Sequence, residues 1–154
     1  MANFITNRGK YIVGITDMTA STFRMMLLTT SFTSDDALNL VDDGTTADPA
    51  TYEITVSGYA RQNVAFTAFE DDTNDFAGLD TGDKTFSALS AGQTVGWAAI
   101  YRYSTSGSPN TTSDTGQDFL FAYQITATPT NGGDITIQIA STSAGGALKI
   151  GSTS

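Results

Sequence analysis

The chain has 154 residues, enough for one domain with a substantial buried core, and 16 acidic against 7 basic residues give it a formal charge of -9. This acidic surplus, with the basic residues scattered singly, opposes direct binding to nucleic acid or to anionic lipid. The chain contains no histidine and no cysteine, which excludes Ser-His-Asp and Cys-His catalysis and His/Cys zinc sites. Its apolar runs are too short to span a bilayer, and we expect no cofactor and no membrane partner.

Apolar and polar side chains alternate at every second position in much of the chain, a pattern that predicts β-strands. In chain order, the predicted strands span residues 11–15, 23–29, 52–57, 64–68, 94–103, 119–126, 135–139 and 148–150. Residues 23–29 are apolar on both faces after Arg24, which predicts a central strand covered on both sides, with a helix as the alternative. In the strand over 52–57, the inward side chains are expected to be Tyr52, Ile54 and Val56.

The two longest predicted strands carry most of the large apolar side chains. Strict alternation over residues 94–103 places five side chains on one face: Val95, Trp97, Ala99, Tyr101 and Tyr103. The same pattern over 119–126 groups Phe119, Phe121, Tyr123 and Ile125. Because the residues between the aromatic ones are small, we expect the aromatic face to pack in the core, with stacking on a sugar ring as the alternative.

The segments between the strands are rich in turn-forming residues. A short helix is predicted over 34–41, where Ser34 can cap the first turn and two aspartates lie at its positive end. The Asn-Gly-Gly turn at 131–133 is predicted to close a hairpin between the strands at 119–126 and 135–139, and 104–117 is predicted to be a long exposed loop. Together these features predict an all-β, antiparallel β-sandwich, jelly-roll-like, with at most one short helix, as a single domain over 11–154.

Carboxylates are densest at Glu70, Asp71, Asp72 and Asp75. Oxygen donors of this kind ligate calcium, and paired carboxylates can hydrolyse a glycoside. The spacing does not match an EF-hand loop, because no glycine occupies the required position. We therefore expect a solvated acidic loop, with a calcium site and then a carboxylate hydrolase as the alternatives, and we assign no catalytic residue. Arg61, in a strand-like region, is expected either to anchor an acidic loop residue or to be simply solvated.

Several short motifs follow one another in an order that resembles a known group of proteins. Ser57-Gly-Tyr-Ala-Arg-Gln62 is followed by Phe66-Thr-Ala-Phe-Glu-Asp-Asp-Thr-Asn74 and a Gly-Leu-Asp turn. Phe86-Ser-Ala-Leu89, the stretch from Ala91 to Arg102, and Asn131-Gly-Gly-Asp-Ile135 come next. In this order, and with the strand at 23–29 ahead of them, the motifs resemble small tailed-bacteriophage virion proteins described as capsid decoration (cement) or head-fibre proteins.

This resemblance implies a non-enzymatic protein, made in the host bacterial cytoplasm, that binds the outer surface of the assembled capsid through the major capsid protein, as a homotrimer. Residues 1–10 are the segment a compact domain does not need, so we expect either an N-terminal arm or an ordinary first strand. As an arm, it would place Phe4 and Ile5 as apolar anchors, with Arg8 and Lys10 against acidic capsid residues. The alternative function is a receptor- or carbohydrate-binding module of a head fibre or tail, using the loop at 104–117.

Overall fold

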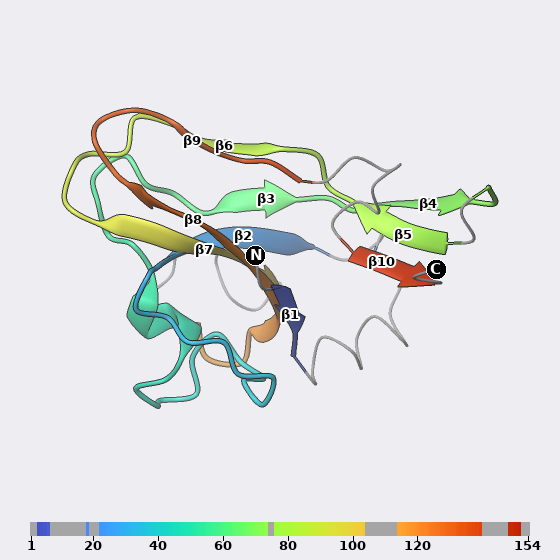
Figure 1. Cartoon of the computed structure of the whole chain (residues 1–154). Helices are drawn as coiled ribbons and strands as arrows, with labels where there is room; N and C mark the ends of the chain where they lie inside the picture. The colour runs from blue at the N-terminus through green and yellow to red at the C-terminus, as the bar shows by residue number, and fades with distance from the viewer. Residues whose placement is uncertain are drawn as a thin grey trace.

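A computed structural model describes residues 3–6, 18, 22–73, 76–103, 114–139 and 148–151 (Figure 1). The predicted all-β, antiparallel class is confirmed. The strands are β1 (Asn3–Ile5), β2 (Phe23–Thr29), β3 (Gln62–Val64), β4 (Thr67–Asp71), β5 (Phe76–Asp80), β6 (Lys84–Phe86), β7 (Thr94–Arg102), β8 (Asp118–Pro129), β9 (Ile135–Ile137) and β10 (Leu148–Gly151), with one 3-10 turn, η1 (Pro49–Tyr52). Across these residues, no helix has the length and apolar character needed to cross a membrane.

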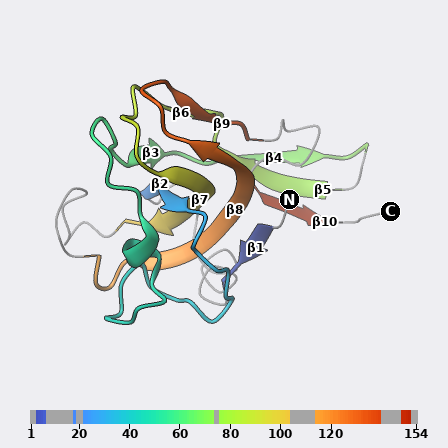
Figure 2. The same ribbon diagram turned by 60° about the vertical axis from the view of Figure 1, so that its left-hand side comes forward.

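The strands form three antiparallel sheets. The largest has five strands in the order β1-β8-β7-β2-β3, with the long hairpin of β7 and β8 at its centre. A three-stranded sheet has the order β10-β5-β4, and β6 pairs with β9. Figures 1 and 2 show β6 and β9 lying over one face of the large sheet, while β8 curves strongly along its length. The predicted jelly-roll connectivity stays a prediction.

The prediction of a central strand at Phe23–Thr29 is confirmed. β2 pairs with β7 along its whole length and with β3 at Phe23, Arg24 and Met25. Side chains on both of its faces are buried, because Phe23, Met25 and Leu27 belong to one core cluster and Met26 and Leu28 to another.

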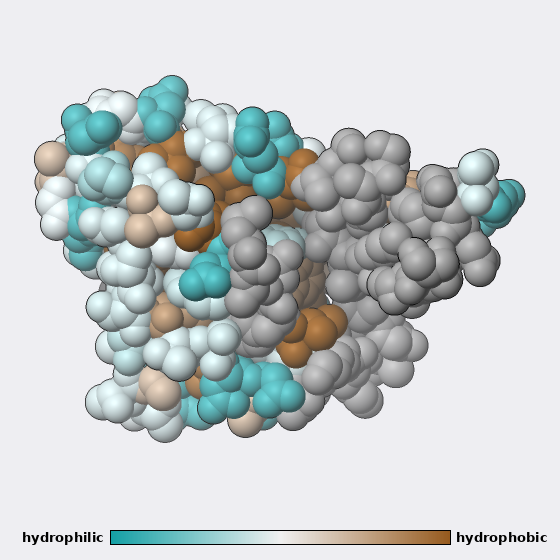
Figure 3. All heavy atoms as spheres, in the orientation of Figure 1, coloured by the Kyte–Doolittle hydropathy of each residue, from teal (hydrophilic) through white to brown (hydrophobic). Residues whose placement is uncertain are grey.

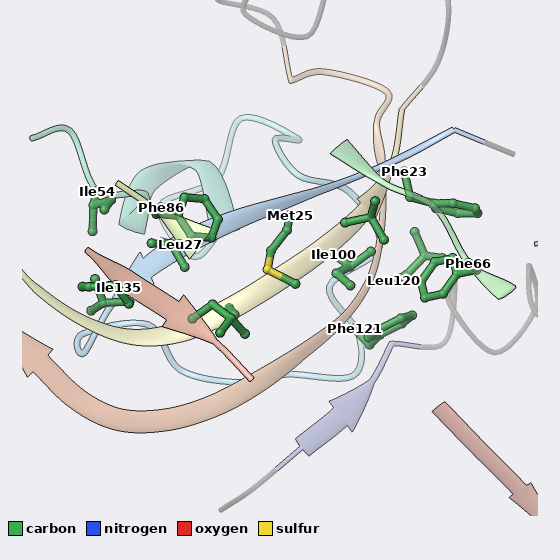
Figure 4. Packing of buried hydrophobic residues seen from close by; sticks show 14 of the residues in the cluster. Phe23, Met25, Leu27, Ile54, Phe66, Phe86, Ile100, Leu120, Phe121 and Ile135 are labelled. Carbon is green, nitrogen blue, oxygen red and sulfur yellow. The ribbon is translucent and has the colours of Figure 1, made fainter. Parts of the chain in front are cut away.

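Each face of the five-stranded sheet therefore has its own apolar core. The first cluster lies between the sheet and the pair β6–β9, and Figure 4 shows Phe86 and Ile135 there with Leu27, Met25 and Ile100. The second cluster lies on the opposite face, where residues 30–53, including η1, cover Trp97, Tyr101 and Phe119.

Two irregularities divide the predicted faces between these clusters. The β2–β7 and β7–β8 registers shift around Gly96, so Val95 joins the first cluster and Trp97 the second. A second shift pairs Tyr101 with Phe119 and Ile100 with Phe121, which places Phe119 in the second cluster. The prediction of one continuous face in each strand was wrong, because an extra residue reverses the alternation beyond it.

Three predicted local structures were also wrong. Residues 34–41 form no helix; Asp35 instead accepts a hydrogen bond from the backbone N–H of Ala37, a local turn that competes with helix formation. Residues 52–57 form no strand, and only Glu53 makes an isolated bridge, to Leu28. The turn at 131–133 closes no hairpin, because β9 pairs with β6 and not with β8.

Candidate functional site

The most concentrated polar structure in the described residues surrounds Arg61, just before β3. Its Nε donates to Glu53 Oε1 at 2.7 Å, and its Nη2 pairs with Glu53 Oε2. Nη1 and Nη2 donate to the two carboxylate oxygens of Asp114, at 2.5 and 2.7 Å. Nη1 also donates to the Tyr101 hydroxyl at 3.0 Å. These bonds use all five N–H groups of the guanidinium, so the cluster has no arginine donor left for a substrate.

Two tyrosines complete this Arg61 cluster. The Tyr59 hydroxyl donates to Glu53 Oε1 at 2.5 Å and accepts a hydrogen bond from the backbone N–H of Leu27 at 3.0 Å. This second bond satisfies a backbone group of β2 at a position where β3 no longer pairs with it. The Arg61 guanidinium lies 5.2 Å from the centre of the Tyr101 ring. The cluster therefore ties Glu53 and Asp114 to each other, to β2 through Tyr59, and to β7 through Tyr101.

Burial controls protonation in this cluster. It raises the pKa of Tyr59 well above its usual value, and the neighbouring charge of Glu53 adds to the effect. It also raises the pKa of Tyr101, although the positive charge of Arg61 acts the other way. For Arg61, burial lowers the pKa, but the hydrogen bonds to Glu53 and Asp114 outweigh it and raise the pKa above the usual arginine value. Both tyrosines therefore stay neutral and Arg61 stays charged throughout the physiological range, so none of the three is poised as a general acid or base.

Of the two alternatives expected for Arg61, the contact with an acidic loop residue is confirmed by Asp114, and simple solvation was wrong. The second partner, Glu53, was missed, because the sequence pattern placed it in a strand whose polar side chains would face solvent. Only the general rule that a half-buried charge needs a partner could have suggested it.

A second buried acid, Asp48, was also missed. It is 1% exposed. Its carboxylate accepts hydrogen bonds from the Thr45 hydroxyl at 2.8 Å and from the backbone N–H groups of Asp43 and Thr45 at 3.0 and 2.8 Å. Burial raises its pKa, but these bonds outweigh burial and hold the pKa below the usual aspartate value. Asp48 therefore orders the loop ahead of η1.

The expectation of core packing for the aromatic face is confirmed for Trp97 and Tyr101, which are 6% and 1% exposed. Phe32 packs edge-on against Trp97, with ring centres 5.6 Å apart. Tyr103 is half-buried at the margin of the same cluster. The rings of Trp97 and Tyr101 are thus unable to stack on a sugar without unfolding this face.

The acidic group predicted at Glu70–Asp75 lies at the β4–β5 hairpin, which Figures 1 and 2 show projecting from the body of the protein. Glu70 and Asp72 are exposed, the backbone of Asp71 ends β4, and Asp75 lies outside the described residues. Within the described part of the chain, no three acidic side chains come together in a way that could hold a metal ion.

The structure describes only two of the four residues proposed as N-terminal capsid contacts. Phe4 and Ile5 belong to β1, which pairs with β8 at the edge of the large sheet, and Ile5 packs against the first cluster. Buried Thr6 donates its hydroxyl to the carbonyl of Phe119 at 2.6 Å and its N–H to that of Leu120 at 2.8 Å. Residues 3–6 are thus a first strand and its continuation, whereas Arg8 and Lys10 lie outside the described residues.

No protein-family model, no curated protein and no solved structure matches this chain.

Proposed function

We propose that this protein is a non-enzymatic capsid decoration protein, which binds the outside of an assembled bacteriophage shell and stabilises it. The observation that carries the proposal is the Arg61 cluster, in which the most chemically distinctive side chains are all used to fasten the fold. A guanidinium with every donor occupied and two tyrosines held neutral by burial suit a rigid structural part better than a catalyst. The virion setting comes from the sequence resemblance.

A decoration protein acts by binding the assembled lattice in preference to separate subunits, so its binding free energy adds to the stability of the shell. A homotrimer that contacts several subunits at once would gain a further factor of roughly 10²–10⁴ from effective concentration. A sheet packed on both faces loses little conformational entropy on docking.

The outer surface also suits this role. Hydrophilic and weakly polar residues cover most of the described surface seen in Figure 3, with apolar residues showing in smaller areas between them. Together with the charge of -9, such a surface would keep decorated particles from adhering to one another.

The N-terminal edge is the proposed shell-facing part. β1 is an outer strand of the large sheet, so residues 3–5 lie at one edge of it. Ile5 packs inward, so Phe4, Arg8 and Lys10 remain the proposed contacts, with the two cations meeting acidic groups of the major capsid protein.

The test is co-sedimentation of the purified chain with undecorated shells, after its mass in solution has been measured by light scattering. We expect saturable binding of a trimer and shells that survive more heat. The double variant Arg8→Glu/Lys10→Glu should lose at least tenfold in affinity while its own unfolding midpoint stays unchanged. Lys84→Glu, a charge reversal on β6, is the matched control and should bind normally. A protein that ignores shells and binds host cells or glycans would replace this proposal with the receptor-binding alternative.

A further inference from the structure

Arg24 differs from the other arginines that the structure describes. Arg61 pairs with Glu53 and Asp114, and Arg102 pairs with Asp118. Arg24 has no carboxylate partner among the described residues, and its buried Nε is the one buried side-chain polar atom there that has no hydrogen-bond partner. In a chain with more than twice as many acidic as basic residues, a half-buried arginine without a carboxylate is unexpected.

Its position is nevertheless fixed. The guanidinium carbon lies 4.8 Å from the centre of the Tyr103 ring, within the range of a cation–π contact. Tyr103 is itself held by a backbone hydrogen bond to the carbonyl of Thr22, at 2.9 Å. An arginine stacked on a ring keeps its N–H edge directed away from the ring face, so this stacking prepares the guanidinium for a planar ligand.

A neutral donor lies beside it on the same sheet face. Asn63 on β3 is directly opposite Arg24 on β2, and directly opposite residues of an antiparallel pair have Cβ atoms about 4.5–5.5 Å apart on one face. Asn63 is exposed, and its amide can donate two hydrogen bonds.

The local charge also permits an anion. Arg24 faces Tyr101 across the β2–β7 pair, and its positive charge acts on that hydroxyl together with that of Arg61. The carboxylates of Glu53 and Asp114 are balanced by the two arginines, so an incoming anion would meet a formally neutral group of charges.

We propose that Arg24, Tyr103 and Asn63 form a binding site for a carboxylate group, presented by an acidic side chain of a partner protein. The terminal nitrogens of the Arg24 guanidinium would donate to the two carboxylate oxygens, and the Asn63 amide would add a bond to one of them. Carboxylate is favoured because the planar fork of arginine matches its two oxygens. The site does not depend on the decoration role, since any partner with an exposed aspartate or glutamate would satisfy it.

The test is an NMR titration of the full-length protein, following the Arg24 Nε–H signal and the Tyr103 ring signals. The probes are sodium acetate, an acetylated tri-glutamate peptide amide and its tri-glutamine counterpart, each against sodium chloride at the same ionic strength. We expect saturable shifts with acetate and with the glutamate peptide, at least fivefold tighter for the peptide, and none with the glutamine peptide. Equal affinity for acetate and the glutamate peptide would keep the carboxylate site and assign it to small free carboxylates.

Variants distinguish this site from a purely structural arginine. Arg24→Gln should abolish the saturable shifts, Asn63→Ala should weaken binding several-fold, and Tyr103→Phe should bind normally because phenylalanine keeps the ring face. Thermal unfolding of each variant establishes that it is folded. If acetate produces only the shifts that chloride produces, or if folded Arg24→Gln responds as the unaltered protein does, the carboxylate site is wrong and Arg24 only balances the charge around Arg61.

Discussion

On one face of the five-stranded sheet the core is closed by two further strands, β6 and β9, whereas on the other face it is closed by the irregular segment 30–53. Phe86, Ile135 and Ile137 enter the first cluster from strands whose alternation directs them inward. The irregular segment has no such repeat, and individual hydrogen bonds and ion pairs hold it in place.

Several of these interactions join distant parts of the chain. The backbone N–H of Val41 donates to the carbonyl of Gln117 at 2.9 Å, and the backbone N–H of Phe119 donates to the carbonyl of Asn39 at 3.0 Å. Asp48 orders the loop before η1, and the Arg61 cluster holds Glu53 beside Asp114. The stability of the strand-covered face thus comes mainly from buried apolar area, while the stability of the loop-covered face also requires hydrogen-bond partners for its buried polar groups.

Truncating one large ring on each face should show this difference most strongly. Phe86→Ala should lower the free energy of unfolding by about 3–5 kcal/mol, because Phe86 is 1% exposed and strands around it cannot easily collapse into the space. Phe32→Ala should cost less, about 2–3 kcal/mol, since Phe32 lies on the irregular segment, which can move inward. Urea denaturation followed by circular dichroism measures both. A larger cost for Phe32→Ala would show that the irregular segment is as rigid as the strands.

The sequence pattern predicted most strands of the large sheet but only part of the strand-covered face. The strands at 94–103, 119–126 and 135–139 were predicted from alternation, and the strand at 23–29 from its apolar side chains on both faces; a shorter strand at 148–150 was also predicted. β6, which pairs with β9, was not predicted. Alternation failed where the backbone departs from it. At Gly96, an added Cβ would lie 2.8 Å from the Cα of Thr30, a close approach that depends on another segment of the chain. No pattern in the neighbouring sequence predicts this bulge.

Alternation also failed to predict how the loop-covered face is built. Residues 52–57 alternate like a strand, yet Tyr52 packs on the second cluster while Ile54 and Val56 pack on the first. The sequence left two alternatives for Arg61, a contact with an acidic loop residue or simple solvation. Its partners lie 8 and 53 positions away, at Glu53 and Asp114, and only the closure of both loops brings them together. Nothing in the sequence pointed to the carboxylate site proposed at Arg24, because that proposal depends on the absence of a carboxylate partner for Arg24 among the described residues.

Removing the central cation should be the next largest effect. Arg61→Met should lower the free energy of unfolding by about 2–4 kcal/mol, because Glu53 and Asp114, whose side chains are 15% and 14% exposed, would lose their shared counter-charge. Arg102→Met is the matched comparison: it removes the counter-charge of one carboxylate, Asp118, whose side chain is 9% exposed, where Arg61→Met removes that of two, so the loss should be about half as large, roughly 1–2 kcal/mol.

The triple variant Arg61→Met/Glu53→Gln/Asp114→Asn separates charge from packing. It should recover at least half of the loss, because it leaves no uncompensated carboxylate. Equal costs for Arg61→Met and Arg102→Met in urea denaturation would show that the second carboxylate of the Arg61 cluster adds nothing to its stability.

The smallest effect should come from one hydroxyl at the meeting point of the sheet and the Arg61 cluster. Tyr101→Phe keeps the ring but removes the acceptor for Arg61 Nη1, which should cost about 0.5–1.5 kcal/mol at neutral pH. The difference should shrink above about pH 10, where tyrosine ionises in the unfolded chain. Burial raises the pKa of Tyr101 in the folded protein, so the unfolded state loses its proton first and the native protein loses stability as pH rises towards that raised value. The phenylalanine variant lacks this proton, and every other tyrosine is common to both proteins. Unfolding free energies measured between pH 7 and about pH 11 would therefore converge, and a difference that stays constant across that range would show that the Tyr101 hydroxyl is as accessible to ionisation in the folded state as in the unfolded one.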